Sequence, residues 1–239
     1  MINIRTSRKS LITTVFLHFL IIAALFVRWL FLANPIGWLP FQINLELCFQ
    51  IEKWFVWIIP ALILIKVFEK EIYISLNDMF TRKVKLKTFL WCFLPVVLYL
   101  VGKLILAKYF GINFNVAQVN QFSSIQECAV NFAKNSGRIL VTAAIPEEIL
   151  FRAWILNALL GNTPTRKQKM IAIILSNILF AAMHWPFYVF QLGYSLVAIS
   201  VFTFVLGSVF SMMFLKSKNI ILPIFIHCFW DAFTATFLN

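Results

Sequence analysis

Long runs of apolar residues, separated by short polar segments, dominate this chain. Each run is about 20 residues long, the length at which an α-helix crosses the roughly 30 Å hydrocarbon core of a bilayer. The pattern predicts an all-α, polytopic integral membrane bundle of about seven transmembrane helices, with eight as the alternative. The expected helices cover 11–33, 49–68, 88–110, 138–160, 168–188, 194–215 and 219–238.

Composition supports this prediction and leaves no room for a soluble domain. Hydrophobic residues make up 62% of the 239 residues and charged residues 13%, and the mean hydropathy is +0.88. Such values are typical of integral membrane proteins. We therefore expect a single membrane domain over 1–239, and we interpret the first run as a retained helix because no signal-peptide cleavage site follows it.

The net charge of +12 has two possible explanations, nucleic-acid binding and membrane topology. The lysines and arginines lie mostly between the apolar runs, and basic and uncharged connections alternate along the chain. This distribution favours topology, with the N-terminus in the cytoplasm, the C-terminus outside and no nucleic-acid partner. The segment 111–137 is too polar to cross the bilayer, and we expect it to hold a helix that lies at the interface.

Three charges interrupt the fourth apolar run, in the stretch AAIPEEILFRAWIL. Glu148 and Arg152 are four residues apart with the acid first, the favourable order for an ion pair on one helical face. Glu147 points about 100° away around the helix, and its carboxylate is therefore the one left unpaired. Because charges inside a membrane are costly, each needs a partner or a function.

Further polar side chains occupy the last helices, again at spacings of one helical turn. Phe180 and His184 share a face of one expected helix, and His227 and Asp231 share a face of the last one. A rise of about 1.5 Å per residue, counted from the cytoplasmic ends, places Glu147 in the same layer as His184, His227 and Asp231. We therefore expect these four groups to converge.

Three motifs in this order resemble those of the CPBP family, the group of CAAX prenyl endopeptidases and bacteriocin-processing enzymes also called Abi proteins. The motifs are EEILFR (E-E-x-x-x-R), FAAMH (F-x-x-x-H) and HCFWD (H-x-x-x-D), and they span about 140 to 235. The resemblance implies an intramembrane endopeptidase in a bacterial cell membrane. Residues 138–239 would form the catalytic helical core, and residues 1–137 the N-terminal helices and the outer loop.

The resemblance also implies roles for single residues. Glu147 would activate water, His184 would orient or deprotonate it, and His227 with Asp231 would stabilise the oxyanion. Glu148 and Arg152 would hold the helix in place. The chain departs from the family at Asp231, where Asn is common, because an ionised Asp accepts hydrogen bonds and cannot donate one. Asp231 would then be protonated, orient His227 or bind a metal.

The sequence leaves the cofactor, the substrate and the class of function open. The motif carboxylates and histidines (Glu147, His184, His227, Asp231) could serve a metal-free mechanism or bind zinc. No H-E-x-x-H motif is present, and we slightly favour a mechanism without a cofactor. The expected substrate is a peptide or a membrane-anchored protein within the lipid bilayer. The alternatives are a non-catalytic immunity or peptide-binding protein, and a transporter with a polar intramembrane network.

Overall fold

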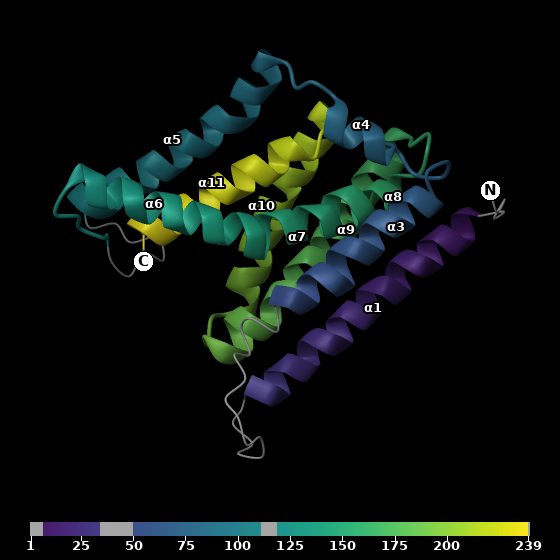
Figure 1. The fold of residues 1–239 in the computed structure, drawn as a ribbon, viewed down its shortest axis with the longest axis horizontal. Helices are drawn as coiled ribbons and strands as arrows, with labels where there is room; N and C mark the ends of the chain where they lie inside the picture. The colour runs from purple at the N-terminus through teal and green to yellow at the C-terminus, as the bar shows by residue number, and fades with distance from the viewer. Residues whose placement is uncertain (1–6, 34–49, 111–118, 239) are drawn as a thin grey trace.

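The structure, a computed structural model, describes residues 7–33, 50–110 and 119–238 (Figure 1). These residues are almost entirely helical and contain no β-strand, so the prediction of an all-α bundle is confirmed. The helices are α1 (Arg8–Ala33), η1 (Lys53–Ile58), α3 (Ile59–Val67), α4 (Leu76–Thr81), α5 (Leu86–Phe110), α6 (Ile125–Ile139), η2 (Leu140–Ala144), α7 (Ile145–Glu148), η3 (Ile149–Leu156), α8 (Asn157–Leu160), α9 (Arg166–Trp185), η4 (Pro186–Gln191), α10 (Leu196–Ser217) and α11 (Ile221–Phe237).

The apolar runs form the helices of a membrane protein. Among the described residues, four helices are long and apolar enough to cross a bilayer, namely α1, α5, α9 with the start of η4, and α10. The other three expected runs are helical as well, but π-helical turns divide two of them and α11 has 17 residues. Many large apolar side chains face outward, Leu98 and Val197 among them, as contact with hydrocarbon requires.

Helical structure is continuous from residue 125 to residue 160 and changes its winding several times. Ser124 caps the first helix, α6, by accepting a hydrogen bond from the Glu127 N–H. Pro146 lacks the N–H that an α-helix would supply to the carbonyl of Thr142, and the preceding turns of η2 are π-helical. The expected interfacial segment therefore runs directly into the helix that carries the two glutamates. Its first part, 111–118, lies outside the described residues, as does the expected loop 34–48.

The helices pack as two connected groups. α9 packs along α10, and α11 packs against α6 and α5. α1 lies beside α3 on the other side of the continuous helix (Figure 1). The larger hydrophobic core joins α1, α3, η3 and α9, and the smaller one joins α5, α10 and α11. The continuous helix thus has neighbours on several sides, and its last part, residues 148–160, is buried throughout.

Several of the basic connections meet at one end of the bundle, which we call the basic end and define by Arg8, Tyr73, Leu159, Lys169 and Lys218. The Arg8 guanidinium donates to the Leu159 carbonyl at 3.1 Å. The ammonium groups of Lys169 and Lys218 lie 5.7 and 5.0 Å from the centre of the Tyr73 ring. Segments that the charge pattern assigns to one side of the membrane therefore lie together.

Candidate active site

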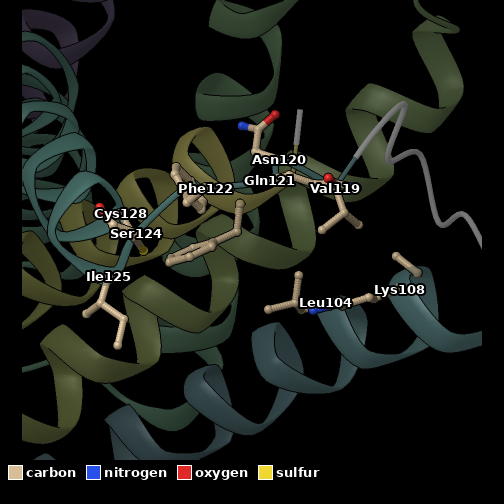
Figure 2. Close-up of a pocket in the computed structure, with 11 residues that line it drawn as sticks. Leu104, Lys108, Val119, Asn120, Gln121, Phe122, Ser124, Ile125 and Cys128 are labelled. Carbon is tan, nitrogen blue, oxygen red and sulfur yellow. The ribbon is translucent and has the colours of Figure 1, made fainter.

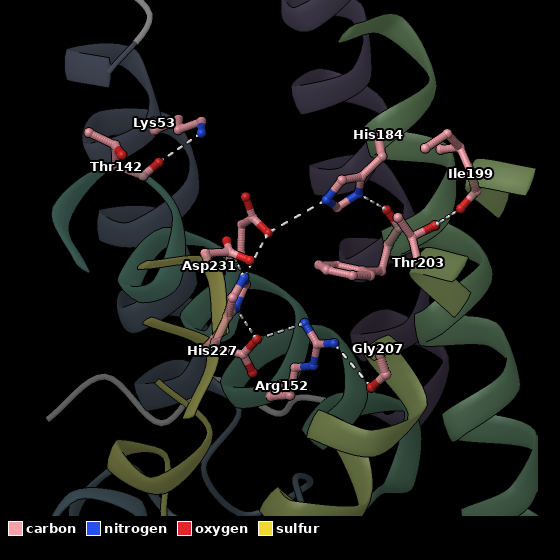
Figure 3. Close-up of polar contacts among 12 residues, drawn as sticks. Lys53, Thr142, Arg152, His184, Ile199, Thr203, Gly207, His227 and Asp231 are labelled. Carbon is pink, nitrogen blue, oxygen red and sulfur yellow. Dashed lines mark hydrogen bonds and ion pairs between the residues drawn. The ribbon is translucent and has the colours of Figure 1, made fainter. Parts of the chain in front are cut away.

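The six polar residues singled out from the sequence come together in one cluster, and Figure 3 labels four of them, Arg152, His184, His227 and Asp231. Three helical segments bring them there: the continuous helix 125–160, the end of α9 and the middle of α11. Glu148 and His227, which are 79 residues apart in the chain, lie within hydrogen-bonding distance of each other. The cluster consists of Glu147, Glu148, Arg152, His184, His227 and Asp231.

Glu147 faces both histidines. Its Oε2 lies 3.8 Å from Nε2 of His184 and 3.9 Å from Nε2 of His227, and its side chain is 14% exposed. These separations are longer than a direct hydrogen bond between the two groups would be. They suit a carboxylate that shares a water molecule with an imidazole, the arrangement that general base catalysis uses.

Glu148 faces Arg152, in the ion pair that the four-residue spacing predicts. Its Oε1 lies 3.1 Å from Nη1 of Arg152, and both side chains are fully buried. The guanidinium also donates from Nη2 to the carbonyl of Gly207 on α10, at 3.1 Å, and lies 4.3 Å from the centre of the Phe180 ring. Two buried charges are tolerable only when they are paired and hydrogen-bonded, and Arg152 meets this condition with partners on two helices.

His227 lies between two carboxylates, an arrangement that the sequence did not reveal. Its Nδ1 lies 2.8 Å from Oε1 of Glu148, and its Nε2 lies 3.3 Å from Oδ2 of Asp231. The contact with Asp231 follows from the i,i+4 spacing on α11. The contact with Glu148 joins two helices, and no local signal in the sequence predicts it. Glu148 therefore orients the imidazole as well as pairing with Arg152.

The protonation of His184 follows from its neighbour in the preceding turn. Nδ1 lies 2.8 Å from the carbonyl oxygen of Phe180, and because a carbonyl only accepts, Nδ1 carries the proton. In the neutral ring Nε2 is then unprotonated, and Nε2 is the atom that faces Glu147. His184 thus presents an acceptor to the site.

Two residues near the cluster were missed from the sequence, Lys53 and Tyr188. Lys53 is buried, donates from Nζ to the Thr142 carbonyl at 2.9 Å (Figure 3) and lies within electrostatic range of Glu147. The adjacent charges Glu52 and Lys53, near the start of an apolar run, are the signal that would have found it. The Tyr188 ring stacks on His184, with centroids 5.9 Å apart and planes 19° apart.

A zinc site at this cluster would need at least three ligating side chains arranged around one point. In the part of the chain that the structure describes, no three His, Cys, Asp or Glu side chains are arranged to hold a metal ion. The side chains around Glu147 therefore do not fit a zinc site.

A cavity of about 920 Å³ lies away from this cluster, where the ends of α5 and α11 meet the segment before α6 (Figure 2). Its walls are largely apolar, with Lys108, Asn120 and Gln121 among the polar lining residues. None of the six clustered residues lines it. The cavity therefore has no part in the arrangement around Glu147.

The family model for type II CAAX prenyl endopeptidases, Rce1-like, matches residues 130–233, a segment that contains all three motifs. No curated protein and no solved structure matches the chain. The family match confirms the resemblance that the motifs indicate: over residues 130–233 this chain is similar to the Rce1-like type II CAAX prenyl endopeptidases, a family of intramembrane proteases.

Proposed function

We propose that this protein is an intramembrane endopeptidase in which Glu147 activates water to hydrolyse a peptide bond of a membrane-associated substrate. One observation carries the proposal: Glu147 Oε2 faces Nε2 of both His184 and His227 at 3.8 and 3.9 Å. Glu148 is engaged by Arg152 and by Nδ1 of His227. The two adjacent carboxylates therefore have different environments, and Glu147 is the one placed to act on water.

In the first step the Glu147 carboxylate takes a proton from water. The water oxygen forms a bond to the carbonyl carbon of the substrate, and the carbonyl π electrons move onto its oxygen. His184 accepts a hydrogen bond from the same water through Nε2 and so fixes its direction of attack. In the second step the carbon–nitrogen bond breaks, the amine leaves with the proton that Glu147 had taken, and the carbonyl re-forms as a carboxyl group.

Asp231 and Glu148 act through His227 in this proposal. Contacts at both ring nitrogens hold the imidazole in one orientation, and carboxylates that orient a histidine in this way are a common supporting device. Of the three roles open to Asp231 from the sequence, its 3.3 Å contact with His227 supports the orienting one. Arg152 holds the Glu148 carboxylate in place through their 3.1 Å ion pair.

The first probe is an internally quenched, farnesylated CAAX peptide offered to the purified protein in liposomes, because the matched family is named for that substrate class. Glu147→Gln should abolish cleavage, a loss of at least about 10³-fold. The matched control is Glu69→Gln, which removes a carboxylate from a surface ion pair with Lys66. The control should keep full activity.

Three outcomes would contradict the proposal. An immunity or peptide-binding protein would keep its peptide affinity and its protective effect in the Glu147→Gln variant. A transporter would move substrate across the liposome membrane without cutting it. Unchanged cleavage by the Glu147→Gln variant would also remove Glu147 from the mechanism.

We place the protein in a bacterial cell membrane with the basic end toward the cytoplasm, because connections rich in Lys and Arg stay on that side.

A further inference from the structure

The groups that converge on Glu147 accept hydrogen bonds more readily than they donate them. The Glu147 and Asp231 carboxylates are acceptors when ionised, and the Nε2 atom of His184 is an acceptor because its proton lies on Nδ1. Peptide hydrolysis passes through a tetrahedral oxyanion that needs a donor aimed at it. The groups that activate water are thus present, and the oxyanion still needs a hydrogen-bond donor.

The donors of the cluster are largely engaged elsewhere. His227 directs Nδ1 to Glu148 at 2.8 Å and Nε2 to Asp231 at 3.3 Å. Arg152 is buried against Glu148 and the carbonyl of Gly207. Lys53 donates to a backbone carbonyl at the preceding turn of the continuous helix. A tyrosine hydroxyl beside the cluster is a further kind of donor.

Tyr188 supplies such a hydroxyl. It lies on η4, one turn after His184, and its ring stacks nearly parallel to the imidazole. The side chain is partly buried, and the carboxylates that act electrostatically on its hydroxyl are Asp231 and Glu147. A phenol is a neutral donor that keeps its proton beside two acids.

We propose that Tyr188 donates its O–H to the oxyanion formed during hydrolysis, the role that an ionised Asp231 cannot fill. The inference rests on the proposed function and adds one residue to it. The hydrogen bond forms as the carbonyl electrons move onto oxygen and weakens when the carbonyl re-forms. The phenol keeps its proton throughout, and Glu147 alone carries the proton from water to the leaving amine.

The test compares Tyr188→Phe with Tyr194→Phe in the farnesylated CAAX peptide assay. Phe retains the ring that stacks on His184 and removes only the hydroxyl. Tyr194 lies in the connection between η4 and α10, is 51% exposed and has its ring centroid 6.1 Å from that of Tyr188, so its variant is a matched control that should keep full activity. For Tyr188→Phe we expect kcat to fall by about 100-fold, with KM unchanged, because an oxyanion contact exists only in the transition state.

A second variant separates the loss of the Tyr188 hydroxyl from a loss of folded protein. Asp231→Asn introduces an amide N–H beside His227, and in that background the loss caused by Tyr188→Phe should shrink to about tenfold or less, as expected for groups that share one role. Equal kcat for Tyr188→Phe and Tyr194→Phe, with cleavage still dependent on Glu147, would overturn the Tyr188 assignment alone. Absence of any Glu147-dependent cleavage in the wild type would overturn the proposed function and, with it, this inference.

Discussion

Removal of Arg152 tests whether Glu148 has a structural role that Glu147 does not share. Arg152→Ala strands the Glu148 carboxylate, which is fully buried and lies 3.1 Å from the lost guanidinium. Removing one partner of a buried pair costs about 3–5 kcal/mol. Glu148 keeps its 2.8 Å contact with His227, so we expect about 3 kcal/mol. For a chain of this size that corresponds to a fall of about 6–12 °C in the unfolding midpoint.

The assay is thermal unfolding of purified variants in one detergent, with the yield of folded protein as a second readout. Glu147→Ala should stay within about 1 kcal/mol of the wild type, because the Glu147 contacts with His184 and His227 are long, at 3.8 and 3.9 Å. Arg166→Ala, at an exposed first turn of α9, is the matched arginine control. Adding Glu148→Gln to Arg152→Ala should recover part of the loss, because the stranded charge is gone. Equal midpoints for Arg152→Ala, Glu147→Ala and Arg166→Ala would refute the reasoning.

Two further predictions concern packing and topology. A Cβ on Gly207 would lie 2.7 Å from Oδ1 of Asn177, so Gly207→Ala should cost about 1–3 kcal/mol in thermal unfolding. Gly137→Ala, where a Cβ meets nothing within 4 Å, should be neutral or stabilising; equal losses in both variants would contradict the packing argument. A cysteine at Lys83, near the basic end, should react with a membrane-impermeant thiol reagent only after cell lysis, and a cysteine at Ile125 should react in intact cells. The reverse pattern of labelling would invert the topology.

The hydrophobic runs predicted the helices well, because a helix that spans lipid needs about 20 apolar residues whatever surrounds it. The four-residue spacings also predicted correctly that Glu148 faces Arg152 and that His227 lies near Asp231. Both contacts arise within one helix, where geometry follows from sequence alone. The match to a CAAX endopeptidase family confirms the resemblance carried by the three motifs.

Contacts between helices could not be predicted in the same way. The hydrogen bond from His227 to Glu148 depends on how α7 and α11 are rotated toward each other, and a rotation of one residue, about 100°, would break it. The π-helical turns around Pro146 change that rotation without any strong periodic signal. Tyr188 and Lys53 were missed for a related reason: the function of a polar residue in an apolar run depends on its neighbours in space, which the sequence does not give.

The π-helical turn just before Pro146 affects where the protein can tolerate the deletion of a single residue. A π turn holds one more residue than an α turn, so η2 (Leu140–Ala144) can lose a residue and close up as ordinary α-helix without breaking the chain of hydrogen bonds. Such a deletion would remove only the extra residue of the turn, and the segments on either side would keep nearly the same rotation relative to each other. A deletion inside α6, which is regular α-helix, would instead turn the residues before it by about 100° relative to Glu147. A single in-frame codon loss should therefore be tolerated better at the π turn than in α6, although every apolar residue stays apolar in both cases.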